Sequence, residues 1–112
     1  MLNGFVFNGV ELHADFSDLK VMESYEQAME VLVNSDKSFT KASESIRHEC
    51  TCINRAFDSI FGEGSADKLF DGRMNRDISY AALYALHDHV AKSQILSNER
   101  IKEMAAKYQH KK

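Results

Sequence analysis

The hydrophobic pattern is most regular between residues 39 and 61, where apolar side chains recur every three or four positions. This spacing predicts one apolar face of a helix about six turns long. The positions that form the face are Phe39, Ala42, Ile46, Cys50, Ile53, Phe57 and Ile60. Gly62 follows where helices commonly end in a left-handed residue. Because burying this face would supply much of a core, we expect the other elements to pack on the 39–61 helix.

A second pattern, apolar and polar positions in alternation, surrounds Asn8-Gly9, the typical sequence of a type I′ hairpin turn. A two-residue loop there gives three cross-strand pairs: Phe5 with Leu12, Phe7 with Val10, and Val6 with Glu11. We therefore predict a β-hairpin within residues 3–14, with its Phe5 face on a helix because isolated hairpins are marginally stable. The outer face, with Val6 and Glu11, and the unpaired edges are candidates for binding a partner.

Further helices are predicted over residues 18–34 and 76–96, capped by Ser17 or Asp18 and by Asn75, respectively. The polar connection after the first of them is short, which indicates an antiparallel pair with the 39–61 helix. Residues 64–72 predict one or two helical turns capped by Ser65 and closed by Gly72.

The pattern weakens at Ser97 and Asn98, which leaves two alternatives open. Either the helix breaks and a C-terminal helix restarts over residues 98–110, or one helix continues to Tyr108. Ile101, Met104 and Tyr108 form an apolar stripe in both cases. This segment either folds back on the core or docks on a partner, so these three residues join Val6 and Glu11 as candidate partner-binding residues.

These elements predict an α+β, mainly α fold: a single domain over residues 1–112, with an N-terminal β-hairpin packed on a bundle of three to four helices. The chain has no proline, which suits a helical fold. Its net charge of −3 argues against a general nucleic-acid binder. No apolar run approaches the roughly 20 residues that span a bilayer, and the start lacks the pattern of a signal peptide, so we expect an intracellular protein without a membrane partner.

The charges are distributed unevenly. Six acidic residues and Lys20 lie between residues 11 and 30, whereas six basic residues lie between residues 92 and 112 beside Glu99 and Glu103. One interpretation is two solvated faces. The other is an acidic front that meets a basic tail, either within one subunit or head to tail between subunits.

Candidate chemistry is sparse. His48 and Cys52 share a helix face and are a candidate half-site for zinc, but the only obvious further ligands, His87 and His89, diverge on a helix. Cys50 lies on the apolar face, where burial raises a thiol's pKa and makes it unreactive. We therefore expect no catalytic residues, no metal and no cofactor, and predict that the protein is not an enzyme.

Three motifs in sequence order resemble a family of small uncharacterised proteins of phages and prophages of Gram-positive bacteria, encoded among tail-morphogenesis genes. They are Phe5-x-Phe7-Asn8-Gly9-x-Glu11-Leu12, Met22-Glu23-x-Tyr25-Glu26-x-Ala28, and Phe61-Gly62-Glu63-Gly64-x-Ala66-Asp67-x-Leu69-Phe70-x-Gly72 with Asn75. The resemblance covers residues 5–84 and leaves the basic tail outside its motifs.

The resemblance implies a non-enzymatic phage structural or assembly protein, such as a tail assembly chaperone or a tail-associated protein. Its partners would be other phage tail proteins or further copies of itself, in the cytoplasm of the bacterial host or in the virion. The alternative is a small helical regulatory or nucleic-acid-binding protein, which would require a basic recognition helix.

Overall fold

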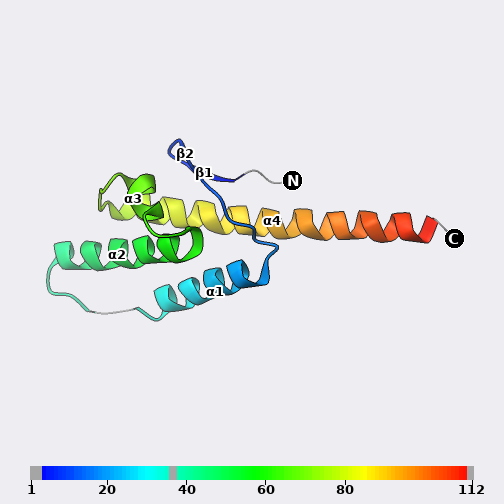
Figure 1. Cartoon of the computed structure of the whole chain (residues 1–112). Helices are drawn as coiled ribbons and strands as arrows, with labels where there is room; N and C mark the ends of the chain where they lie inside the picture. Colours follow the sequence, from blue (N-terminus) through cyan, green and yellow to red (C-terminus); the bar gives the residue numbers. More distant parts are fainter. Residues whose placement is uncertain (1–3, 36–37, 111–112) are drawn as a thin grey trace.

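The computed structural model describes residues 4–35 and 38–110. In these residues a two-stranded hairpin precedes four helices (Figure 1). The elements are β1 (Phe5–Phe7), β2 (Val10–Leu12), α1 (Leu19–Val33), α2 (Ala42–Phe61), α3 (Ser65–Phe70) and α4 (Arg76–His110). The predicted α+β, mainly α fold with an N-terminal hairpin is confirmed.

The hairpin has the predicted register, because Phe5 pairs with Leu12, Val6 with Glu11, and Phe7 with Val10. Asn8 and Gly9 have φ values of 50° and 75°, as a type I′ turn requires. The hairpin packs on α3 and α4. It also reaches α2, since the ring of Phe5 lies 5.9 Å from that of Phe57 and 5.8 Å from that of Phe61.

Helices α1 and α2 form the predicted antiparallel pair (Figure 1). Of the two candidate caps, Asp18 is the one used: its carboxylate accepts hydrogen bonds from the backbone of Lys20 and Val21. The predicted start of the second helix at Phe39 is wrong, because α2 begins at Ala42.

The physical reason is that the start of α2 lies beyond the end of α1, so the first turn has little to pack against and Ala42 is exposed (Figure 1). Lys41 at the N-cap is extended and provides no side-chain cap. Phe39 therefore lies outside the helix, where its ring contacts that of His48 at a centroid distance of 5.1 Å.

Helix α3 forms as predicted, but its cap differs. Gly64, in the left-handed conformation, is the N-cap, and Ser65 is the first helical residue. The side chain of Asp58, on α2, accepts the backbone N–H of Ala66 at 2.9 Å. A carboxylate from a neighbouring helix thus replaces the local serine cap. At the other end, the C-cap Asp71 and the following Gly72 both have positive φ values, 51° and 73°, so Gly72 closes the segment as predicted.

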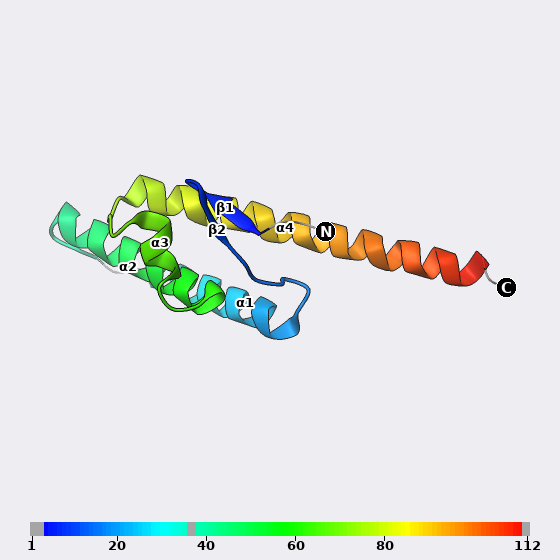
Figure 2. The same cartoon turned by 45° about the horizontal axis from the view of Figure 1, so that its top comes forward.

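Helix α4 runs without a break from Arg76 to His110, which decides between the two alternatives at Ser97. Asn75 accepts the N–H of Ile78 as the predicted cap, and no glycine or proline follows Gly72 to interrupt the helix. The first part of α4 packs on the body, whereas its C-terminal part projects beyond it (Figures 1 and 2). The molecule is consequently elongated, with extents of 68 × 29 × 21 Å.

Candidate protein-interaction site

The feature that distinguishes this molecule is the free end of α4, residues 98–109, which we call the arm. Every side chain of the arm is exposed. Its apolar residues Ile101, Met104 and Tyr108 are 61%, 64% and 82% exposed, respectively. The alternative in which this segment folds back on the core is therefore wrong.

The apolar stripe of the arm continues the side of α4 that faces the body. Leu86 and Val90 are buried on that side, and Gln94 follows one turn later. The side-chain amide of Gln94 donates a hydrogen bond to the backbone oxygen of Phe16 at 2.7 Å. Steps of three or four residues then lead to Ile101 and on to Tyr108, so all lie along one face. The packing face of α4 thus extends past the end of the body, where the described chain does not cover it.

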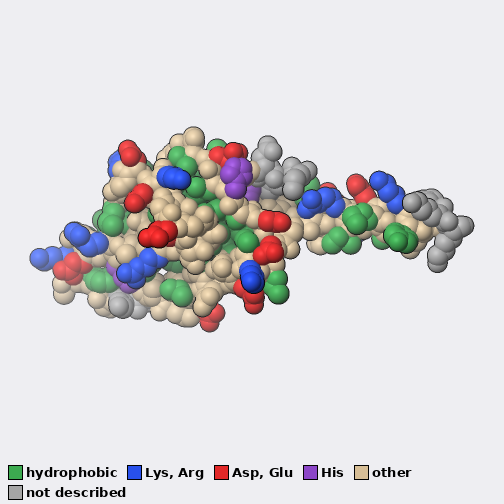
Figure 3. Space-filling view, viewed as in Figure 1, with side chains coloured by type: hydrophobic (Ala, Val, Ile, Leu, Met, Phe, Trp, Pro, Cys, Tyr) green, Lys and Arg blue, Asp and Glu red, His purple; other side chains and the backbone are tan. Residues whose placement is uncertain are grey.

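Charged side chains are arranged around this stripe. At 100° per residue, Arg100 and Lys107 lie along one edge of the stripe, whereas Glu99, Lys102 and Glu103 lie toward the opposite side of the helix. Blue basic and green hydrophobic side chains are both visible on the arm in Figure 3. A partner for this stripe would combine apolar positions with acidic ones.

The hairpin candidates lie elsewhere. Val6 is 57% exposed and pairs with Glu11 on the outer face. The carboxylate of Glu11 contacts the His13 ring at 3.1 Å. Glu11 also lines a cavity of about 640 Å³ at the base of the arm, together with Arg100 and the ring of His89. The structure therefore brings Glu11, but not Val6, to the cavity beside the arm.

His48 and Cys52 share a face of α2 as predicted, with 3.7 Å between Nε2 and Sγ. Nε2 of His48 also hydrogen bonds to the backbone oxygen of Ser35. His87 and His89 diverge, because His87 bonds to Tyr25 while His89 contacts the rings of Phe5 and Phe16. Among the described residues, no group of three or more potential ligands is placed to hold a metal ion.

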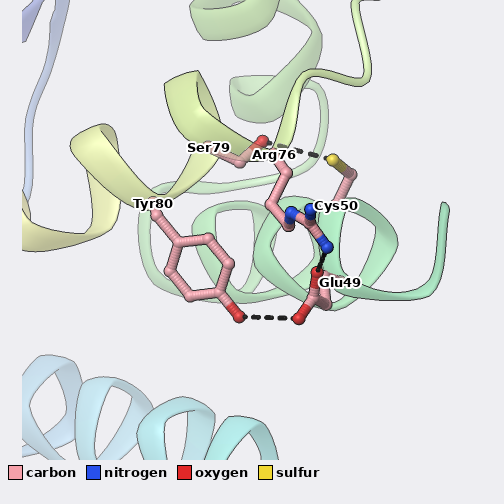
Figure 4. Close-up of polar contacts among 5 residues, drawn as sticks. All are labelled: Glu49, Cys50, Arg76, Ser79 and Tyr80. Atoms are coloured by element: carbon pink, nitrogen blue, oxygen red, sulfur yellow. Dashed lines mark hydrogen bonds and ion pairs between the residues drawn. The ribbon is translucent and has the colours of Figure 1, made fainter. Parts of the chain in front are cut away.

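A polar cluster between α2 and the start of α4 was not predicted (Figure 4). Glu49 accepts hydrogen bonds from Arg76 and from the hydroxyl of Tyr80, each at 3.3 Å. The hydroxyl of Ser79 donates to the buried thiol sulfur of Cys50 at 3.6 Å. Burial, followed by the charge of Glu49, raises the pKa of Tyr80. Because these groups already bond to one another, the arrangement is typical of contacts that hold two helices together.

A second surface that the sequence did not predict lies between α1 and α2, and we call it the furrow. One part of it is a cavity of about 340 Å³ with apolar lining from Ala28, Val31 and Ala56. An adjoining cavity of about 440 Å³ shares Val31 and adds Glu30. Three exposed glutamates, Glu23, Glu26 and Glu30, lie along α1, and Glu30 is the one that lines this adjoining cavity. Sequence periodicity could place the glutamates on the outside of α1, but it could not show which part of α2 completes the furrow.

Comparisons with known proteins give one family. A family model described as a family of unknown function (DUF6673) matches residues 8–112, a range that includes the arm. Searches of curated proteins and of solved structures found no match. Within the described residues, no helix has the combined length and hydrophobicity needed to cross a membrane.

Proposed function

This chain belongs to the DUF6673 family, whose function is unknown, and we propose that it is a non-enzymatic phage or prophage protein of tail morphogenesis. In this proposal it works as an assembly chaperone or a tail-associated protein. It acts through protein–protein contacts of the arm, in the cytoplasm of the bacterial host or in the virion. Its partners are other tail proteins or further copies of itself.

The observation that carries the interaction role is the exposed stripe of Ile101, Met104 and Tyr108 on a helix without support from the body. Fully burying a side chain such as isoleucine or methionine is worth about 1.5–3 kcal/mol. A short helical segment is marginal in water without tertiary packing. Both considerations favour a partner that covers the stripe.

The phage tail context rests on the three motifs described in the sequence. All three coincide with structural features: the first forms the hairpin, the second lies within α1, and the third forms the end of α2, α3 and the turn that follows. These motifs support a shared fold with the phage proteins that they resemble. The arm lies outside these motifs, and in this proposal it is the part of the chain that recognises the partner.

The test uses an arm variant with Ile101→Glu and Met104→Glu, which places two charges on the stripe. Ala106→Glu is the matched control, because it adds a charge on the opposite side of the same helix. Each protein is mixed with the purified tail proteins encoded by neighbouring genes. We expect wild type and the control to bind one of them, or to self-associate, and the arm variant to lose this binding while keeping its unfolding free energy.

Gene order provides an independent check. A position between the genes for a major tail protein and a tape-measure protein agrees with the proposal. A position beside a repressor gene, together with normal tails in a phage that carries the arm variant, would contradict it.

One observation favours the alternative of a small regulatory or nucleic-acid-binding protein: Arg100, Lys102 and Lys107 are all exposed on the arm. Tyr108 is the single aromatic residue there that could stack on a base, and the whole chain is acidic. Fluorescence anisotropy with labelled duplex DNA and single-stranded RNA distinguishes the two functions. Salt-dependent binding that a Lys102→Gln, Lys107→Gln variant loses would favour the alternative.

A further inference from the structure

We propose that the arm of one copy binds the furrow of a second copy, so that the chain assembles head to tail. The inference rests on the proposed function, in which the arm binds protein, and it names both the partner and the receiving surface. Four features of the described residues support it: the direction of the arm, its charges, the lining of the furrow and the acidic edge of α1.

The arm does not reach the furrow of its own copy. Helix α4 is continuous to His110, and the arm leads away from the body (Figures 1 and 2). The furrow lies between α1 and α2, on the body. Bending the arm back would require a break in a helix that contains neither glycine nor proline. The occupant of the furrow must therefore come from another molecule.

Pairing of two arms with each other is disfavoured by their charges. In an antiparallel pair joined through the apolar stripes, Arg100 of one copy would face Lys107 of the other. Both side chains are exposed and basic. Like charges in facing positions destabilise such pairs. A surface of opposite charge is a better partner for the stripe.

The furrow provides that surface. Ala28, Val31 and Ala56 give it an apolar lining, and Val31 is itself 59% exposed. Glu23, Glu26 and Glu30 are exposed along α1. An amphipathic helix that binds a groove uses anchors at positions i, i+3 and i+7, which is the spacing of Ile101, Met104 and Tyr108. The arm therefore matches the furrow in hydrophobicity and in charge.

The charges also define an orientation. The edge of the arm with Arg100 and Lys107 faces the glutamates of α1, and the other edge, which has no basic residue, faces α2. Arg55 lines the furrow on the α2 side, so the more basic edge avoids it. We expect higher salt to weaken the contact, because these charges are exposed and screened.

This contact joins two different surfaces, so it is heterologous and leaves a free arm at one end and a free furrow at the other. Repetition yields a ring if the rotation closes and an open chain if it does not. The arm is about 18 Å long at 1.5 Å per residue, and one face of it is smaller than the roughly 800 Å² per partner of a standard interface. Assembly should thus depend strongly on concentration.

The test combines two full-length variants that each remove one half of the contact. The arm variant carries Ile101→Glu and Met104→Glu, and the furrow variant carries Val31→Arg. Val33→Arg and Ala106→Glu are the controls, because Val33 is exposed at 78% outside the furrow and Ala106 is on the back of the arm. Circular dichroism establishes that every variant is folded, and sedimentation velocity across a wide concentration range measures the assembly.

We expect the wild type and both controls to form larger species as concentration rises, and each half-contact variant alone to remain monomeric. An equimolar mixture of the two variants should form a 1:1 dimer that grows no further, because it contains one intact arm and one intact furrow. This restricted rescue is specific to a head-to-tail contact.

Three results would overturn the inference. Loss of assembly in the arm variant alone, with the furrow variant unchanged, would place the partner surface elsewhere and leave the proposed function standing. Loss in both variants without rescue in the mixture would indicate a symmetric contact. A monomeric wild type at every concentration would also refute self-assembly, and arm-dependent binding to a tail protein would then show that the proposed function survives without it.

Discussion

Tyr25 connects α1 with α4. These two helices have few direct contacts, and each packs mainly on α2. The ring of Tyr25 is buried on α1 and packs edge-on against Phe16. Its hydroxyl forms a hydrogen bond with Nδ1 of His87, on α4. Burial raises the pKa of the Tyr25 hydroxyl above its ordinary value. This bond and the contact of the Gln94 amide with the sulfur of Met22 at 3.6 Å join α1 to α4.

We predict that Tyr25→Phe lowers the free energy of unfolding by about 1 kcal/mol, because it removes the hydrogen bond and keeps the packed ring. Tyr84→Phe is the control, since the side chain of Tyr84 is largely exposed and its change should stay within about 0.5 kcal/mol. Urea unfolding measures both. Equal stability of Tyr25→Phe and wild type would mean that this hydrogen bond contributes nothing net.

His89 lies beside the aromatic rings of the core. Its ring is edge-on to Phe5 and Phe16, at centroid distances of 5.7 and 5.8 Å. Burial lowers the pKa of His89, and the charge of Lys92 lowers it further, against an opposite effect of Asp88. The folded protein therefore holds this ring neutral more strongly than the unfolded chain does.

We predict that stability falls as the pH drops through about 6.5, the ordinary pKa of histidine. The unfolded chain takes up the proton first, so the loss begins at 6.5 and is complete below the folded pKa. The measurement is the free energy of unfolding as a function of pH. His89→Gln should flatten this part of the curve, whereas His13→Gln, at an exposed position, should not. A profile that is equally steep in the His89 variant would contradict the assignment.

At the scale of elements, α4 combines two roles in one helix. Its first part contributes Ala82, Leu86 and Val90 to the core. Its second part, the arm, has only exposed side chains. Helix continuity past Ser97 follows from a segment without glycine or proline and rich in alanine, lysine and glutamate.

We predict that truncation after Ser97 leaves the melting temperature nearly unchanged, because every side chain of the arm is exposed. The same truncation should abolish association with a partner. Thermal unfolding followed by circular dichroism provides the measurement, at a low protein concentration where self-association is weak. A loss of several kcal/mol would mean that the arm packs on the body in solution.

The hairpin was predictable in full because Asn8-Gly9 and the alternating side chains determine the same register. The helices were predictable from their apolar periodicity, but their starts were less so. Phe39 continues the apolar pattern of α2 and yet lies outside it, since the helix start depends on where α1 ends. The cap of α3 comes from Asp58, whose proximity to Ala66 only the folded chain creates.

The candidate site was predictable in part. Ile101, Met104 and Tyr108 stand out in the sequence at helical spacing, and the structure places them on the arm. The furrow could not be predicted, because it depends on which residues of α1 and α2 face each other. The contact of Glu49 with Arg76 and Tyr80 was missed for the same reason: the residues are far apart in the sequence.

At the scale of the whole molecule, the structure consists of a body with one core and a helical arm that projects from it (Figure 3). The acidic residues of α1 are on the body and the basic residues are on the arm. Of the two ways in which an acidic front can meet a basic tail, contact between subunits is the one that the direction of the arm favours. The head-to-tail assembly that we propose would explain both the unequal charge distribution and the elongated shape.

The central claim is that a protein partner covers the stripe of the arm. Hydrogen exchange of the arm, followed by mass spectrometry, tests this most directly, because an unsupported helix exchanges its amides quickly. We predict fast exchange over residues 98–109 in dilute protein and at least tenfold slower exchange at high concentration or with the tail partner, without such protection in the Ile101→Glu, Met104→Glu variant. Exchange that stays equally fast under every condition would contradict the account.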